Sequence, residues 1–232
     1  MPIDYSRVKA ICFDVDGTLS DTDDQFVQKL VKLLSPINFL FRHRDVFPSA
    51  RRLVMFTEGP GNWVYSFADR VGLDHKIVAL GDRFYESGIG VTSEPYQLIN
   101  GVREMLVTLR NYYPLSIVSA RGRKSTFKFL FQFELFSCFT AIATGQTCVH
   151  TKPYPDPIKW AAEKMRVPTS SCLMVGDTVV DILAGKRAGA QTVGVLCGFG
   201  AEKELKRAGA DLILENTTDL VDMFVKARSL PL

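Results

Sequence analysis

Two aspartates, Asp14 and Asp16, are separated by one residue and directly follow an apolar run, residues 8–13, that only Lys9 interrupts. The run is typical of a buried strand in a parallel sheet. Alternation along an extended chain places both carboxylates on one side, at the carboxyl end of that strand. Neighbouring carboxylates repel each other, and a hard cation with oxygen ligands such as Mg²⁺ relieves the repulsion. Taken alone, D-x-D-G is more typical of an ordinary Asx turn at the end of a strand, and the rest of the chain favours the metal site.

Polar residues close later apolar runs in the same way. Ser119 ends one run, Lys152 stands in the loop after another, and Asp177 and Asp181 follow a third. The carboxyl ends of parallel strands lie along one edge, so these groups are predicted to converge with the first two aspartates. The set suits phosphoryl transfer. A carboxylate can attack phosphorus, a hydroxyl and a lysine can hold the other oxygens, and further carboxylates can bind a metal.

Repeated strand–helix alternation must position these residues. Apolar runs predict strands, and helices are expected between them; the strands lie at residues 8–13, 115–119, 139–144, 172–175 and 192–196, with a short sixth at 212–214. This order predicts an α/β fold with a doubly wound, Rossmann-like parallel sheet. Residues 21–92 carry helical spacing and no strand alternation, too long for a simple crossover. We therefore expect a core domain of residues 1–20 and 93–232, with an inserted all-helical cap domain at 21–92.

Composition limits the class of protein. Of 232 residues, 47% are hydrophobic and 23% charged, which is ordinary for a globular protein with a large core. The net charge of +3 is too small to indicate a nucleic-acid partner, and no apolar run reaches the length of a membrane span. Five cysteines, an odd number without metal-ligand spacing, are expected as reduced thiols. We expect a cytoplasmic enzyme without a membrane or nucleic-acid partner; its oligomeric state is left open.

At this point the chain resembles the haloacid dehalogenase-like hydrolase superfamily. The stretch Asp14-Val15-Asp16-Gly17-Thr18 is similar to its first motif, Ser119 to its second, Lys152-Pro153 to its third, and Gly176-Asp177 with Asp181 to its acidic fourth. The order agrees, and a helical cap often follows the first motif in this superfamily. Residues 198–211 also resemble the tail of the phosphoglycolate phosphatase-like branch. The four motifs are specific for the superfamily and say little about the substrate.

The resemblance implies a role for each of these residues. Asp14 would be the nucleophile and a Mg²⁺ ligand. Asp16 would protonate the leaving oxygen, then deprotonate the attacking water, and its backbone carbonyl would also bind the metal. Asp177 would be a side-chain metal ligand, and Asp181 would orient a metal-bound water or the lysine. The transferring phosphoryl group would be held by Ser119, the Ala120 amide and Lys152.

Two further residues have weaker expectations. Thr18 is expected to support the loop of the first motif. Arg121 directly follows the phosphate-holding Ser119 and is the first candidate for a substrate contact.

The resemblance leaves three functions open. A Mg²⁺-dependent phosphatase acting on a small phosphorylated metabolite through an aspartyl phosphate is favoured, because Asp16 can protonate an ester oxygen, which a dehalogenase does not need. A phosphomutase or another phosphotransferase is the alternative. Its branch has a cap histidine where this chain has Phe26. A catalytically silent binding module is the third. The leaving group is undetermined among phosphoglycolate, pyrophosphate, sugar phosphates and nucleotides.

Overall fold

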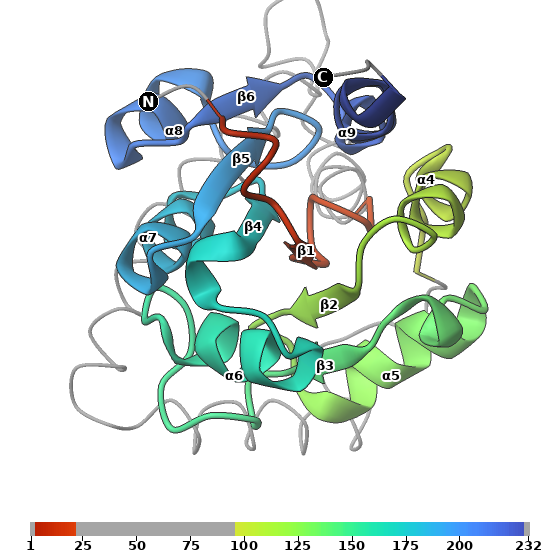
Figure 1. Cartoon of the computed structure of the whole chain (residues 1–232). Helices are drawn as coiled ribbons and strands as arrows, with labels where there is room; N and C mark the ends of the chain where they lie inside the picture. Colours follow the sequence, from red (N-terminus) through yellow and green to blue (C-terminus); the bar gives the residue numbers. More distant parts are fainter. Residues whose placement is uncertain (1–2, 22–95, 230–232) are drawn as a thin grey trace, which may run out of the picture.

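A computed structural model describes residues 3–21 and 96–229. Within these ranges the chain forms one parallel sheet with the strand order β3-β2-β1-β4-β5-β6 (Figure 1). The strands are β1 (Ala10–Phe13), β2 (Leu115–Val118), β3 (Ala141–Ala143), β4 (Cys172–Gly176), β5 (Gln191–Val195) and β6 (Leu212–Leu214). The predicted doubly wound sheet is confirmed, including its short sixth strand. The predicted cap, with Phe26, lies outside the described residues except for Asp21.

Helices cover both faces of the sheet. The α-helices are α4 (Val102–Leu109), α5 (Arg123–Gln132), α6 (Asp156–Met165), α7 (Val179–Ala188), α8 (Glu202–Ala208) and α9 (Leu220–Ser229). Short 3-10 turns are η3 (Phe136–Cys138), η4 (Thr169–Ser171) and η5 (Thr217–Asp219). Figure 1 shows α4 and α9 on one side of the sheet and α6 and α7 on the other. In the described ranges, no helix has the length and apolar character needed to cross a membrane.

The side chains of β1 alternate between two apolar clusters. Ile11 and Phe13 pack in the cluster that includes side chains of α4 and α9, whereas Ala10 and Cys12 pack in the cluster with α6 and α7. All four are fully buried. Both faces of a parallel sheet are covered, so its central strand is an uninterrupted apolar run rather than an alternating one.

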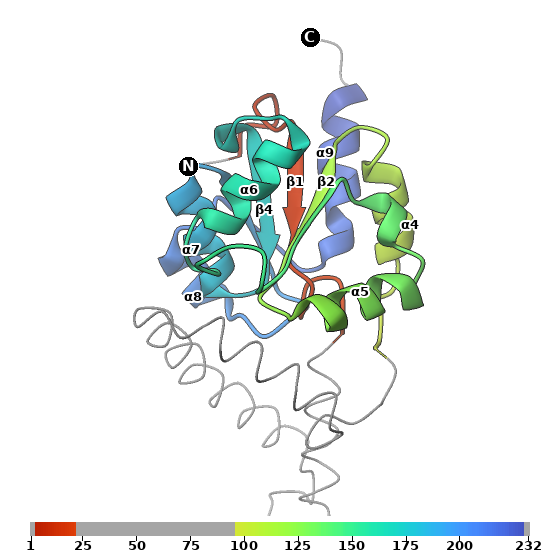
Figure 2. The same ribbon diagram turned by 90° about the horizontal axis from the view of Figure 1, so that it is seen from below.

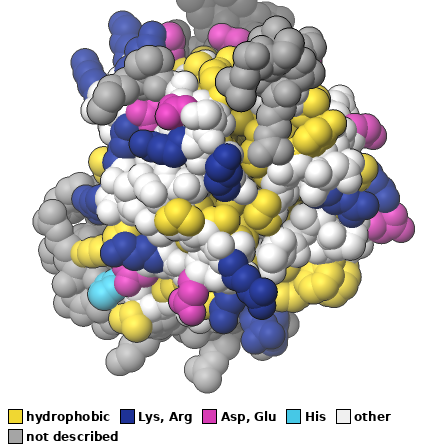
Figure 3. All heavy atoms as spheres, viewed as in Figure 1, with side chains coloured by type: hydrophobic (Ala, Val, Ile, Leu, Met, Phe, Trp, Pro, Cys, Tyr) yellow, Lys and Arg dark blue, Asp and Glu magenta, His cyan; other side chains and the backbone are white. Residues whose placement is uncertain are grey.

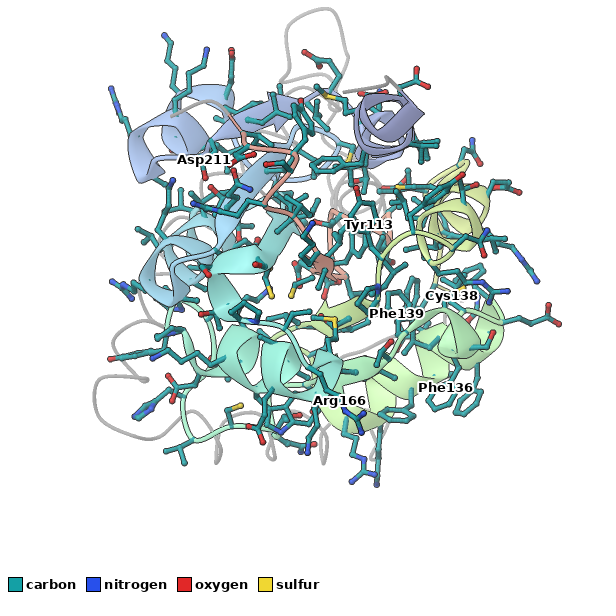
Figure 4. All side chains as sticks on the ribbon, in the orientation of Figure 1. Tyr113, Phe136, Cys138, Phe139, Arg166 and Asp211 are labelled. Atoms are coloured by element: carbon teal, nitrogen blue, oxygen red, sulfur yellow. The ribbon has the colours of Figure 1, made fainter. Side chains whose placement is uncertain are left out.

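Tyr113, labelled in Figure 4, attaches α9 to the region just before β2. Its ring packs edge-on against Phe224, with centroids 6.2 Å apart, and its hydroxyl donates a hydrogen bond of 3.4 Å to the Phe224 carbonyl oxygen. Both residues are buried. This contact holds the C-terminal helix against the face of the sheet opposite α6 and α7.

Strand β3 is shorter than the predicted 139–144. The preceding residues form the η3 turn, and the Thr144 backbone N–H donates to Thr147 Oγ1 at 2.8 Å. That N–H is therefore directed into a local turn instead of the sheet ladder, which ends the strand at Ala143.

The strand order reverses direction at β1. Strand β1 pairs with β2 on one side and with β4 on the other, and every pairing in the described sheet is parallel. Figure 2 shows β1, β2 and β4 side-on, running in the same direction. Open α/β sheets bind ligands in the crevice beyond the carboxyl ends of the strands at such a switch point. Asp14 and Asp177, which follow β1 and β4, therefore lie where a ligand site is expected.

Candidate active site

Asp14 is held at the carboxyl end of β1 by the neighbouring strand. Its backbone N–H donates to the Val175 carbonyl oxygen of β4 at 2.9 Å. Its side chain is largely buried, and Oδ1 lies 2.7 Å from Lys152 Nζ. The chain thus places a carboxylate and an ammonium group in contact, although 138 positions separate them in sequence (152 − 14).

Lys152 lies between two carboxylates. Its Nζ also donates to Asp181 Oδ1 at 2.6 Å, and its side chain is only 3% exposed. Asp181 Oδ2 accepts hydrogen bonds from the Thr178 N–H and hydroxyl at 3.0 and 2.6 Å, forming the capping box of α7. The start of α7 therefore fixes the position of the lysine.

Asp177 is fully buried in a tight enclosure at the end of β4. Its Oδ1 accepts from the Thr18 hydroxyl at 3.2 Å and its Oδ2 from the Phe199 N–H at 2.9 Å. A Cβ added to Gly17 or to Gly198 would lie 2.3 Å from Asp177 Oδ2. These glycines are needed because only a residue without a side chain lets the backbone come so close.

The donor set fits a divalent cation. Asp14, Asp177 and Asp181 are all buried and offer carboxylate oxygens within 4.8 Å of one another. Three carboxylates against the single ammonium of Lys152 give this cluster a net charge of −2 if all are ionised (−3 + 1). Uncompensated buried charge is strongly unfavourable, and a hard cation with oxygen ligands such as Mg²⁺ would neutralise it. Asp181 is paired with the charged Lys152 and accepts two further hydrogen bonds from Thr178. The hydrogen bonds to Asp177 come from uncharged donors, and Asp14 contacts Lys152 through Oδ1, so Asp14 and Asp177 are the better direct ligands.

The surroundings shift the protonation of this cluster. The pKa of Asp14 is raised to about 7, chiefly by burial; the Lys152 charge lowers this pKa, and the neighbouring Asp181 and Asp16 charges raise it. Burial lowers the pKa of Lys152, but the contacts with Asp14 and Asp181 outweigh it and hold that pKa above its ordinary value. Lys152 therefore stays charged, whereas Asp14 needs a positive charge in addition to Lys152 to be fully ionised near neutral pH.

Asp16 faces a different partner. Arg121 Nε donates to Asp16 Oδ2 at 2.6 Å, and Arg121 Nη2 donates to Asp16 Oδ1. The guanidinium carbon lies 4.8 Å from the centre of the Tyr96 ring and 5.6 Å from that of Phe129. Arginine is suited to this place because its planar group can stack on aromatic rings while its edge forks onto a carboxylate.

The second predicted motif joins this pair. Ser119 is buried at the end of β2, and its Oγ accepts the Arg121 backbone N–H at 3.1 Å. Ala120, between them, is exposed. The structure thus forms two groups at one sheet edge: the carboxylate cluster around Lys152, and the Asp16–Arg121 pair with Ser119.

Sequence reasoning singled out Thr18, which donates to Asp177, but it did not identify the other residues that hold Asp177 or those that hold Arg121. The Phe199 N–H and Gly198 lie after β5, in a segment singled out only for its resemblance to a phosphatase tail. The glycines on both sides of Phe199 were the sequence feature that could have predicted a close approach of the backbone there. Tyr96 and Phe129 carry none, because aromatic residues are common in any core.

Comparison with known proteins shows the family of the chain. The family described as haloacid dehalogenase-like hydrolase matches residues 11–195. The chain belongs to that family. Pyrophosphatase PpaX of Oceanobacillus iheyensis is 28% identical over 216 residues, which cover 92% of this chain and 95% of the relative. Phosphoglycolate phosphatase of Photobacterium profundum is 26% identical over 237 residues, covering 94% and 96%.

Solved structures share the fold of this haloacid dehalogenase-like hydrolase. A family hydrolase from Deinococcus radiodurans R1, with bound phosphate and sodium, matches with a TM-score of 0.68 at 24% identity, covering 97% of this chain and 98% of that one. At that identity the likeness establishes the fold alone. Its sequence relatives thus include a pyrophosphatase and a phosphoglycolate phosphatase.

Proposed function

We propose that the protein is a Mg²⁺-dependent phosphatase that hydrolyses a small phosphorylated metabolite through an aspartyl phosphate on Asp14. The observation that carries this proposal is the contact of Asp14 with Lys152 inside a cluster of three buried carboxylates, at the switch point of the sheet. A carboxylate nucleophile beside a fixed cation is what attack on an anionic phosphoryl group requires.

In the first step, a carboxylate oxygen of Asp14 forms a bond to phosphorus while the bond from phosphorus to the leaving oxygen breaks. Asp16 gives its proton to that oxygen, so that a neutral alcohol departs; acid–base help of this kind typically contributes about 10²–10⁴ in rate. Lys152 and Ser119 hold the non-bridging oxygens. The phosphoryl group is then carried by Asp14.

In the second step, water attacks the same phosphorus. Asp16, now a carboxylate, takes a proton from that water, and the bond between phosphorus and the Asp14 oxygen breaks. Inorganic phosphate is released, Asp14 is again a carboxylate and Asp16 is again protonated, which completes the cycle.

Asp14 and Asp177, with the Asp16 backbone carbonyl, would hold the metal. When bound, Mg²⁺ would screen the negative charge of the phosphoryl group from that of the carboxylates. Asp181 does not need to bind it, because its hydrogen bonds already orient Lys152 and cap α7.

The test is phosphate release from a panel of phosphorylated metabolites with Mg²⁺, using the wild-type protein and Asp14→Asn. We expect release by the wild type and loss of at least about 10³-fold in the variant, because the amide cannot act as the nucleophile. Mass spectrometry of acid-quenched enzyme should find a phosphoryl group on the peptide that carries Asp14. A folded Asp14→Asn protein with the full rate would contradict the proposal.

The same panel separates the alternatives. Isomerised sugar phosphate in place of free phosphate would identify a phosphomutase. Ligand binding that needs no Mg²⁺ and leads to no hydrolysis would identify a binding module.

A further inference from the structure

Arg121 occupies the carboxylate of Asp16, which is the acid–base group of the proposed reaction. Arg121 donates to both carboxylate oxygens of Asp16, through Nε and Nη2. In the proposed function, Asp16 must face the leaving oxygen within about 2.6–3.2 Å. While both of its oxygens accept from Arg121, a substrate oxygen has to compete for the same carboxylate.

The aromatic rings around Arg121 fix the position of its guanidinium group, but they do not determine which anion pairs with it. The Tyr96 and Phe129 rings lie against the guanidinium group, 4.8 and 5.6 Å from its carbon, and the Arg121 side chain is only 12% exposed. The Asp16 side chain is 33% exposed. A charge enclosed by aromatic rings needs an anion at its remaining edge. Asp16 is the more exposed of the two side chains, which leaves this end of the pair accessible to another anion.

We propose that Arg121 is a specificity-determining residue that binds a second anionic group of the substrate, a carboxylate or a phosphate placed close to the leaving oxygen. This inference rests on the proposed function, since it needs Asp16 to act on that oxygen. Arg121 exchanges Asp16 for the substrate anion. The released Asp16 carboxylate then takes up a proton from water and can give it to the leaving oxygen.

Distances set the size of this substrate. The leaving oxygen lies one hydrogen bond from Asp16, and Arg121 lies one hydrogen bond from Asp16 in this structure. The guanidinium group is therefore roughly 5–6 Å from the leaving oxygen, or two hydrogen-bond lengths. A carboxylate or phosphate attached within one or two bonds of that oxygen spans this gap. The substrate anion then forms a bidentate pair with Arg121, which replaces the pair between Arg121 and Asp16.

The exchange makes the second anion matter for turnover as well as binding. An ester with an uncharged tail offers Arg121 no replacement partner, so Asp16 stays engaged. The binding energy of a charged tail is used to free the acid at the moment of reaction, which raises kcat and not only the affinity.

The experiment compares substrates of similar size. Kcat/KM is measured for 2-phosphoglycolate, with a second carboxylate, for pyrophosphate, with a second phosphate, and for ethyl phosphate, with an uncharged tail. The proteins are the wild type, Arg121→Gln, Arg121→Lys and Arg123→Gln. Arg123 is an exposed arginine at the start of α5 and provides the matched loss of one positive charge.

We expect the wild type to prefer at least one anionic substrate over ethyl phosphate by about 10- to 100-fold, the range of a charged hydrogen bond. Arg121→Gln lowers that preference at least tenfold, with part of the loss in kcat. Arg121→Lys retains an intermediate preference, because it keeps the charge without the fork. Arg123→Gln keeps the wild-type preference. The preferred anionic substrate shows whether the second group is a carboxylate or a phosphate.

Two results would overturn the inference and leave the proposed function intact. One is a wild type that releases phosphate from ethyl phosphate as fast as from both anionic substrates, which needs no variant to fold. The other is an Arg121→Gln protein with a wild-type circular dichroism spectrum and an unchanged preference, which would make the arginine only a support for Asp16. No phosphate release from any substrate, or full activity in Asp14→Asn, would overturn the proposed function itself.

Discussion

Lys152 and Asp181 form a buried ion pair, with Nζ 2.6 Å from Oδ1 and side chains 3% and 0% exposed. The other oxygen of Asp181 caps α7. One carboxylate thus connects the lysine that contacts Asp14 to the first turn of a helix. A change at Asp181 should therefore affect activity and stability together.

Asp181→Asn should lower phosphate release at least tenfold, because it removes one of the two negative charges that hold Lys152. It should also lower the free energy of unfolding by about 2 kcal/mol, since a buried lysine loses part of its compensation. Kinetics and urea denaturation measure the two effects. Glu163→Gln, an exposed acid on α6, is the control and should change neither. Wild-type kinetics in Asp181→Asn would contradict the assigned contact.

Gly17→Ala should abolish most activity and lower the melting temperature. Gly17 has a φ of +68°, and an added Cβ would lie 2.3 Å from Asp177 Oδ2. Gly189→Ala is the matched control, because its φ is +78° but nothing lies within 4 Å of an added Cβ. Gly189→Ala should lower the free energy of unfolding by about 1–2 kcal/mol, because alanine disfavours the left-handed backbone conformation, and it should keep its activity. Equal activity losses in the two variants would argue against the enclosure of Asp177.

Mg²⁺ should stabilise the protein through Asp177. A ligand at a hundred times its dissociation constant adds about 2.7 kcal/mol, which corresponds to a rise of several degrees in Tm. Asp177→Asn should abolish this rise, and chelation by EDTA should abolish phosphate release. The control is Glu215→Gln, an exposed acid after β6, which should show the wild-type rise. If Mg²⁺ raises the Tm of Asp177→Asn as much as that of the wild type, Asp177 is not a ligand of the metal.

Asp211 should make the free energy of unfolding depend on pH in the acidic range. It lies between α8 and β6 and is labelled in Figure 4. Burial raises its pKa, but hydrogen bonds from Lys186 and from the Thr192 N–H and hydroxyl outweigh this and hold the pKa of Asp211 below its ordinary value. A lowered folded-state pKa means that the stabilisation is complete above the unfolded value and is lost as pH falls through the folded value.

Asp211→Asn should therefore be less stable than the wild type at pH 7, by about 1 kcal/mol, with the difference shrinking below about pH 4. Urea denaturation at several pH values measures it. Asp222→Asn, an exposed acid on α9, is the comparison and should not reproduce the pH dependence. A difference that is constant from pH 7 to pH 3 would contradict the contribution of the charge.

The surface carries both signs of charge. On the face shown in Figure 3, Lys and Arg side chains are interspersed with Asp and Glu. This agrees with the small net charge of +3. We therefore expect buried groups such as Arg121, rather than the overall electrostatic potential of the surface, to recognise the charge of the substrate.

Much of the fold and of the site could be predicted from sequence, because strands buried on both faces are apolar runs and a parallel sheet brings their carboxyl ends together. That reasoning predicted Asp14, Lys152, Asp177 and Asp181 at one edge, and the structure brings them together there. It overestimated the length of β3, where a Thr147 hydroxyl takes the N–H that the ladder would have used.

The sequence by itself determined which residue types stand at the strand ends, because burial periodicity and chain order are local properties. Only the tertiary structure decided the pairings: Asp16 with Arg121, 105 positions apart, and Asp177 with Thr18, 159 positions apart. Such contacts depend on how separate loops pack against one another, and no spacing along the chain encodes that. The same packing makes Arg121 a partner of the proposed acid, which sequence order alone placed only near the phosphate.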